Sequence, residues 1–473
     1  MLFNSIPFFI FFFIVFGIYF LLPGKWRWSV LLAASCYFYM AFIPVYILIL
    51  ISIVLVDYFA AIKMEVTISE KRRNMYYYLA LFANLAILIF FKYFNFFNEN
   101  LTALLSIANL SNPVHFIKLI LPLGISFSTF QSMAYLVDIK NRKIKAEKHL
   151  GIYALFIMFF PHISSGPIAK PGYLLPQFHK ANRLNATDIS VGFSQVLLGL
   201  FKKAVVGDML GNYVDTFYGG YESYSGFASI FTAWIFLFQL YADFSGYTDI
   251  ATGTARMLGY RLNVNFTLPL FSKTMTEFWR RWHISLSEWL RDYVYTPIYI
   301  AKRDWGKAAV VFSQMTTFAI CGLWHGAGWQ FIIYGLIHGL YLVSEYLLKI
   351  KSSYYNKNFL KKCIGVFITF NLISFSLIFF RSPDMAYAAA MISNIFTNPL
   401  PLKVIIFDSG FFISMLFMLA VLLIIDYVYF RNNSFDSLYL NRKKGLFALN
   451  VFLLMLIVLF GISSNTQFIY FQF

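Results

Sequence analysis

Apolar stretches of nearly bilayer length recur along the whole chain. A helix that spans the hydrocarbon core of a membrane needs about 20 predominantly apolar residues. The stretches cover 6–22, 28–43, 45–62, 76–94, 113–137, 150–164, 190–206, 226–248, 309–324, 329–348, 363–380, 411–429 and 446–462. Several are too short to cross alone, and short or broken segments usually re-enter or line a cavity. We therefore expect an all-α polytopic membrane protein with roughly ten to twelve crossings plus re-entrant and interfacial helices.

Composition excludes a soluble protein. Hydrophobic residues make up 60% of the chain and charged residues 12%, whereas soluble domains are about 45–50% apolar. The formal net charge is +17. In a membrane protein this excess is typical of cytoplasmic loops, and it also suits an anionic donor such as a CoA thioester. No arginine-rich recognition element is present, so we expect no nucleic-acid partner.

The basic clusters predict the orientation of the chain. Those at 25–27, 63–73 and 140–148 fall on the cytoplasmic side if the N-terminus is extracytoplasmic, and the loop expected at 95–112 is free of Lys and Arg. Clusters at 349–362 and 431–444 are then cytoplasmic, and the last span delivers the tail 463–473 to the outside. This count requires a segment near 150–164 to dip into the membrane and return.

The longest stretch without an obvious span, 249–308, combines basic and aromatic residues. It includes four tryptophans: Trp279, Trp282, Trp289 and Trp305. Such helices are typical of a membrane surface, and we place them on the cytoplasmic side. No linker or repeat divides the chain, so residues 1–473 are expected to form one integral domain. The cysteines Cys36, Cys321 and Cys363 have the spacing of neither a metal site nor a disulfide framework.

Two histidines are the main candidates for chemistry. His325 lies between two apolar segments in Cys321-Gly-Leu-Trp-His-Gly-Ala-Gly328. An imidazole can act as a general base near neutral pH, although a structural histidine is equally compatible with this spacing. His283 lies among arginines and tryptophans; on a continuous helix it would share a face with Trp279. Its alternative role is in an interfacial anchor helix, which spacing alone favours. His338 is expected to be a packed helix residue.

Asp243 and Asp249 lie in a polar run at the end of 226–248. Charged groups inside apolar segments are functional candidates. We favour buried ion pairs with the basic stretch 256–307 over direct catalysis, and therefore treat both carboxylates as supporting residues.

Ordered motifs along nearly the whole chain resemble the membrane-bound O-acyltransferase family, in its alginate O-acetyltransferase-like bacterial branch. The most specific are Tyr241-Ala-Asp-Phe-Ser-Gly-Tyr-Thr-Asp249, Phe278-Trp-Arg-Arg-Trp-His-Ile-Ser-Leu-Ser287 and Gly322-Leu-Trp-His-Gly-Ala327. The resemblance implies tilted spans around a central funnel, with His325 as the catalytic histidine and His283 as the second catalytic position. The second position is Asn in many eukaryotic members.

The resemblance also implies the substrates. Acetyl-CoA is the expected donor, with no bound cofactor or metal. The residues expected to bind it are Trp279, Arg280, Arg281 and Trp282, with Trp324 in support. The acceptor is a cell-envelope or exported polysaccharide at the bacterial inner membrane, whether alginate-like, peptidoglycan or another exopolysaccharide. A teichoic-acid-type D-alanyl transferase fed by a carrier protein is the nearest alternative. A transporter or flippase is an alternative of another class, although its typical internal repeats are not found.

The uncharged tail Phe468-Ile-Tyr-Phe-Gln-Phe473 is compatible with an interfacial plug. The envelope-acylating branch carries a similar aromatic motif, in which a tyrosine is proposed as a transient acyl carrier, and Tyr470 matches that position. A phenol has a pKa near 10, so its ester remains an activated acyl donor. The chain has no Gly-x-Ser-x-Gly elbow, which agrees with a final transfer by an extracytoplasmic partner of the SGNH-hydrolase type.

Overall fold

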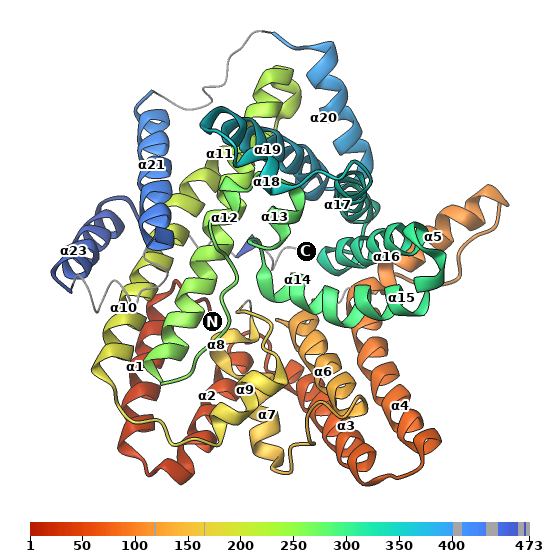
Figure 1. Cartoon of the computed structure of the whole chain (residues 1–473), viewed down its shortest axis with the longest axis vertical. Helices are drawn as coiled ribbons and strands as arrows, with labels where there is room; N and C mark the ends of the chain where they lie inside the picture. Colours follow the sequence, from red (N-terminus) through yellow and green to blue (C-terminus); the bar gives the residue numbers. More distant parts are fainter. Residues whose placement is uncertain (118–119, 165, 401–408, 432–442, 462–467, 470–473) are drawn as a thin grey trace. The chain divides into compact units, whose positions relative to one another are not determined.

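The computed structural model describes residues 1–117, 120–164, 166–400, 409–431, 443–461 and 468–469 (Figure 1). Within these ranges every regular element is helical. Eight helices there are long and apolar enough to cross a membrane, at 44–66, 70–107, 186–218, 226–257, 307–325, 359–381, 409–429 and 443–460. Three shorter apolar helices cover Ile6–Leu21, Leu150–Ile163 and Met385–Thr397. The all-helical membrane fold is confirmed; the number of crossings stays a prediction.

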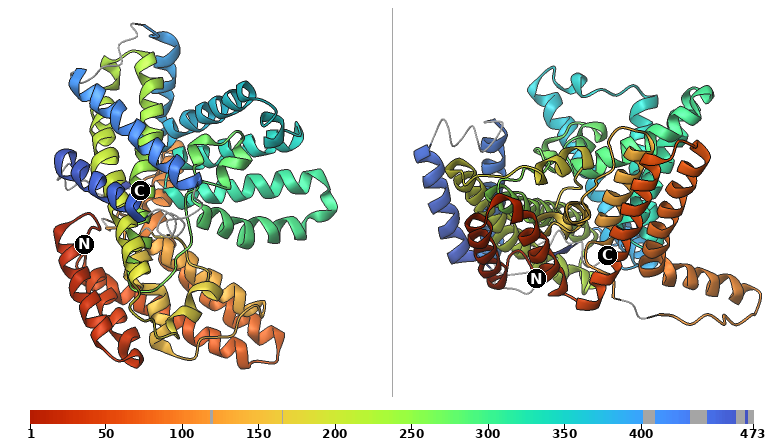
Figure 2. Two further views of the ribbon diagram at one scale, coloured as in Figure 1. Left: turned by 60° about the vertical axis from the view of Figure 1, so that its left-hand side comes forward. Right: turned by 90° about the horizontal axis from the view of Figure 1, so that it is seen from below.

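The chain divides into two compact units. The first comprises Met1–Asn185 with Leu258–Asn263, and the second comprises Ala186–Met257 with Val264–Phe473. In Figure 2 the first unit runs from red to yellow, and most of the second from yellow-green to blue. The expectation of one integral domain stays a prediction.

The first unit consists mainly of α-helices. They are α1 (Ile6–Leu21), α2 (Arg27–Met40), α3 (Ile47–Val66), α4 (Glu70–Leu88), α5 (Phe94–Ile107), α6 (Ile125–Lys140), α7 (Leu150–Met158), α8 (Phe160–Ile163) and α9 (Pro171–Phe178). The short helical turns η1 (Gly24–Trp26) and η2 (Pro44–Tyr46) precede α2 and α3.

Two predicted boundaries in this unit are wrong. A π-helical turn, η3 (Ile89–Tyr93), joins α4 to α5, so most of the loop expected at 95–112 is helical. This stretch contains neither glycine nor proline, so nothing local ends the helix before Ile107. The stretch expected at 113–137 becomes helical only at Ile125. Gly124 precedes it with φ +66°, and a Cβ there would lie 2.0 Å from the Ile163 carbonyl oxygen.

A buried carboxylate joins four helices of the first unit. Asp57 of α3 accepts hydrogen bonds from Asn84 Nδ2 of α4 at 2.7 Å and from Tyr153 Oη of α7 at 3.1 Å. Ser132 Oγ of α6 also donates to this carboxylate. Helices α3, α4 and α6 lie side by side (Figure 1). Burying a polar group is tolerated when it is hydrogen-bonded, and this cluster meets that condition.

The second unit begins with two long helices in close contact. Helix α10 (Ala186–Leu200) continues through the π-helical turn η4 (Phe201–Gly207) into α11 (Asp208–Tyr218), and η5 (Tyr221–Ser223) leads into α12 (Gly226–Met257). Helices α10 and α12 lie side by side (Figure 2).

Two glycine pairs set the approach of α10 and α12. A Cβ on Gly199 would lie 2.5 Å from the Gly246 carbonyl oxygen, and one on Gly192 would lie 2.7 Å from that of Gly253. Small residues allow such backbone contact between membrane helices. Both pairs therefore fix the two helices in one register.

The rest of the second unit carries the histidine motifs. Its described α-helices are α13 (Met275–Trp279), α14 (Ile284–Leu290), α15 (Thr296–Ala301), α16 (Lys307–His325), α17 (Trp329–Leu347), α18 (Ser352–Tyr355), α19 (Phe359–Arg381), α20 (Met385–Thr397), α21 (Ser409–Arg431) and α23 (Lys443–Phe460). Short turns lie between them: η6 (Pro269–Phe271), the π-helical η7 (Arg291–Tyr295) and η8 (Arg303–Trp305).

Candidate active site

His325 is the last residue of α16, where the chain turns into α17. The two helices pack through glycines: a Cβ on Gly335 would lie 2.1 Å from the Phe318 carbonyl oxygen. This close approach encloses His325, which is only 4% exposed. Its ring centroid lies 5.6 Å from that of Tyr334 and 5.2 Å from that of Phe380. The imidazole thus occupies an aromatic enclosure built by α16, α17 and α19.

His283 does not lie on the continuous helix that would place it on one face with Trp279. Helix α13 ends at Trp279, and His283 is the N-cap of α14 with φ 42°. Backbone bonds to a distant segment replace the helical ones: Ile284 N donates to Asn265 O at 2.9 Å, and Thr267 N donates to Arg281 O at 3.0 Å. Tertiary pairing therefore overrides the helical pattern at this position.

The aromatic ring of Trp324 brings the two histidines together. Its centroid lies 4.9 Å from the ring of His325 and 5.8 Å from that of His283. His283 is fully buried, and its other face meets Phe244 of α12 edge-on at 4.7 Å. Residues more than 40 positions apart in the sequence thus pack against one tryptophan ring. The catalytic roles of the histidines stay predictions.

Burial lowers the pKa of His283 from 6.5 to about 3, because aromatic surroundings penalise the imidazolium form. The side chain is consequently neutral at physiological pH. A neutral imidazole can hydrogen-bond or orient a substrate, but it does not supply a fixed positive charge.

This pKa predicts a specific acid sensitivity. An unfolded histidine takes up a proton below about pH 6.5, whereas folded His283 does not until about pH 3. Folding therefore loses stability as the pH falls through this window, by about 1.4 kcal/mol at pH 5.5. His283→Asn should reduce the fall in melting temperature between pH 7.5 and 5.5, measured in detergent. An unchanged fall would contradict the prediction. His115→Asn, at an exposed histidine, provides the matched control.

The four residues expected to bind the donor have different environments. Trp279 and Trp282 are buried, the latter stacked on Phe278 at 5.4 Å. Arg281 forms an ion pair with Glu277 at 2.6 Å, while the side chain of Arg280 is exposed. Among these four, Arg280 is the exposed residue, and the donor-binding role of all four stays a prediction.

His338 is a packed helix residue, as expected, and its bonds fix its tautomer. Trp279 Nε1 can only donate, so Nδ1 of His338, at 3.3 Å, accepts. The other nitrogen, Nε2, then carries the proton and donates to Ser376 Oγ at 2.8 Å. Ser376 in turn donates to Ile373 O at 2.7 Å. The His338 ring packs 4.6 Å from Tyr334, which also contacts His325. This chain of bonds therefore supports the wall of the histidine site.

Asp243 is buried and Asp249 is half-buried, and both form ion pairs, but the predicted partners are wrong. Both pair with consecutive lysines of η4: Lys203 Nζ lies 2.5 Å from Asp243 Oδ1, and Lys202 Nζ lies 3.1 Å from Asp249 Oδ2. The expected partner Arg256 instead pairs with Asp188 at 3.2 Å.

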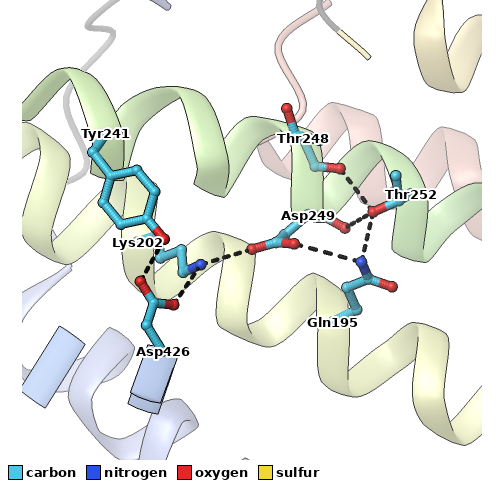
Figure 3. A network of polar contacts seen from close by, with 7 residues as sticks. All are labelled: Gln195, Lys202, Tyr241, Thr248, Asp249, Thr252 and Asp426. Carbon is cyan, nitrogen blue, oxygen red and sulfur yellow. Dashed lines mark hydrogen bonds and ion pairs between the residues drawn. The ribbon is translucent and has the colours of Figure 1, made fainter. Parts of the chain in front are cut away.

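Each lysine also contacts a second carboxylate. Lys202 lies 2.9 Å from Asp426 of α21, which accepts a 2.5 Å bond from Tyr241 Oη (Figure 3). Lys203 lies 2.8 Å from Asp208. Buried charges are tolerated when they are paired and hydrogen-bonded. Residues of η4, α11, α12 and α21 together supply that pairing.

The C-terminal segment reaches the same region through its two described residues. Phe468 is fully buried and stacks on Tyr247 at 4.5 Å, with Phe244 at 5.6 Å. Ile469 N donates to Asp243 Oδ2 at 2.9 Å. The acyl-carrier candidate Tyr470 follows directly in the chain and lies outside the described residues.

Comparisons with known proteins show the family of this chain. Residues 147–382 match the membrane-bound O-acyltransferase family. A peptidoglycan O-acetyltransferase of Helicobacter pylori is 34% identical over 83% of this chain and 79% of its own length. This chain belongs to the membrane-bound O-acyltransferase family. A probable alginate O-acetylase of Pseudomonas syringae pv. tomato is also 34% identical, over 84% of this chain and 75% of its own. A teichoic acid D-alanyltransferase of Bacillus subtilis is 29% identical over 57% of this chain and 70% of its own length.

Sequence reasoning missed several residues around the site of this membrane-bound O-acyltransferase. Lys202 and Lys203 interrupt the apolar segment 190–206, and a charge in such a segment is itself a signal. The rings that enclose the histidines, such as Phe244 and Phe380, gave no comparable signal because the chain contains 57 phenylalanines.

Proposed function

We propose that this membrane-bound O-acyltransferase takes acetyl groups from cytoplasmic acetyl-CoA and passes them outward for O-acetylation of a cell-envelope or exported polysaccharide. The observation that carries the proposal is the pair of buried histidines on one tryptophan, at the motifs of an acyltransferase family. The activities named for two relatives, a peptidoglycan O-acetyltransferase and a probable alginate O-acetylase, favour acetyl transfer to a polysaccharide.

The proposed first step transfers the acetyl group to Tyr470. Its phenol oxygen attacks the thioester carbonyl carbon while His325 accepts the phenol proton, as a general base does. The carbon–sulfur bond breaks, and the imidazolium returns the proton to the departing thiolate. The products are O-acetyl-tyrosine and free CoA. His283, which is neutral, is suited to orienting the acetyl group rather than balancing charge.

The proposed second step occurs outside the cytoplasm. A serine of an SGNH-hydrolase-like partner attacks the phenyl ester, the tyrosine leaves as a phenol, and the acetyl group then passes to the polymer. These two steps require an inner-membrane protein whose tail lies outside the cytoplasm. The basic clusters at 63–73 and 140–148 accord with an extracytoplasmic N-terminus and tail, because such clusters are typical of cytoplasmic loops. Arg280 is an exposed arginine, so it is the candidate for contact with a donor phosphate.

Purified protein in liposomes tests the donor directly. We expect release of free CoA from acetyl-CoA, detected with a thiol reagent, and transfer of labelled acetyl to the chain. A D-alanyl-loaded carrier protein should give no transfer. Transfer from the carrier alone would overturn the acetyl assignment in favour of D-alanylation, and inactivity with both donors would favour a transporter.

A further inference from the structure

Asp243 has two carboxylate oxygens in two different roles. Oδ1 lies 2.5 Å from Lys203 Nζ, whereas Oδ2 accepts the backbone N–H of Ile469 at 2.9 Å. The lysine belongs to η4 and the carboxylate to α12, while Ile469 belongs to the C-terminal segment. One buried side chain therefore contacts both Lys203 and the C-terminal segment at Ile469.

The Lys203 pair keeps this carboxylate in place. The aspartate is 3% exposed and Lys203 is 2% exposed. Lys203 is also held by Asp208 at 2.8 Å, so its ammonium group has a fixed position between two helices. A hydrogen bond to a charged acceptor is stronger than one between neutral groups. The Ile469 N–H accordingly has a strong and rigid acceptor.

Aromatic packing leads from this bond to the histidines. Phe468 stacks on Tyr247, one helical turn beyond Asp243 on α12, and also contacts Phe244. Phe244 also contacts His283, at 4.7 Å. The residues just before Tyr470 thus share α12 as a platform with the second histidine of the site.

We propose that Asp243 is a positioning residue that clamps the C-terminal segment at Ile469 beside the histidine site. The proposal rests on the function proposed above, in which Tyr470 carries the acetyl group. Asp243 acts through Ile469, the residue that precedes the acyl carrier, and it holds the tail without contributing to the chemistry itself.

Hydrogen–deuterium exchange of the C-terminal peptide measures the clamp without any activity. Asp243→Ala removes the acceptor, so the Ile469 amide should exchange at least about tenfold faster. Asp243→Asn keeps an acceptor oxygen and should retain most of the protection. Asp426→Asn removes a carboxylate from the neighbouring Lys202 pair, whose ion pairs and hydrogen bonds do not include the described tail residues Phe468 and Ile469, and it should leave the Ile469 amide unchanged. Unchanged exchange in Asp243→Ala would overturn the clamp.

Acetyl labelling of the chain tests the positioning role. Ile469→Pro removes the donor N–H and leaves both charges intact, whereas Ile469→Val keeps the N–H at similar size. We expect at least about tenfold slower labelling in Ile469→Pro and in Asp243→Ala than in Ile469→Val, with monodisperse protein in each case. Wild-type labelling rates in both variants would overturn the positioning role. An unlabelled wild-type chain would instead count against the Tyr470 relay, and the exchange data would still decide the clamp.

Discussion

His325→Ala is expected to abolish acetyl transfer while leaving the amount of protein in the membrane unchanged. The substitution removes the proposed base that deprotonates Tyr470, and loss of a general base costs about 10²–10⁴ in rate. The buried ring is surrounded by Trp324, Tyr334 and Phe380 rather than exposed, so no solvent-borne base replaces it readily. Release of CoA from acetyl-CoA by purified protein measures the effect.

Two further variants separate chemistry from packing. His325→Gln fills more of the enclosure than alanine but lacks a comparable base, so it should be equally inactive. His115→Ala removes an exposed histidine of the first unit and should have the wild-type rate. If His325→Ala retained more than about a tenth of the wild-type rate, His325 would not be the base.

Tyr470→Phe is expected to stop transfer and to remove the acetyl label from the chain. The change deletes one hydroxyl group, which is the only nucleophile in the proposed first step. Purified wild-type chain incubated with radiolabelled acetyl-CoA should carry a weak label that alkaline treatment releases as acetate, because phenyl esters hydrolyse readily. The variant should carry none, a loss of at least about 10³-fold in transfer, as for other nucleophiles acting as a unit with a base.

A matched tyrosine controls for loss of a hydroxyl group as such. Tyr37→Phe changes a tyrosine that is 57% exposed in the first unit and should leave labelling intact. A wild-type transfer rate in Tyr470→Phe would return the tail to a structural role. The loss of label in His325→Ala, with Tyr470 still present, would place the histidine before the acyl-tyrosine.

The helical membrane fold followed from the sequence because each apolar stretch encodes its own hydrogen-bonded span. The histidine motifs were equally visible, since imidazoles flanked by glycine or tryptophan stand out in apolar surroundings. The prediction was wrong for the local backbone geometry of His283. The residues from Trp279 to Ile284 contain neither glycine nor proline, so a helix was the natural expectation. The break depends on bonds to Asn265 and Thr267, which no local pattern records.

The predicted ion-pair partners of Asp243 and Asp249 were wrong for a related reason. Asp243 and Asp249 were matched to the nearest basic stretch along the chain. In the structure both carboxylates instead pair across a helix interface with Lys202 and Lys203. These consecutive lysines lie in the π-helical turn η4 and reach different aspartates. To predict ion pairs of this kind, one must know which helices are in contact.

The glycine pairs between α10 and α12 have a practical consequence. Gly199 faces Gly246, and Gly192 faces Gly253, so closely that a Cβ on any of them would clash with the facing backbone. The fit between the two backbones therefore sets the alignment of these helices. These backbone contacts do not depend on the charge of the lysines and aspartates beside them. An isosteric change such as Asp243→Asn therefore keeps the glycine contacts that align the two helices.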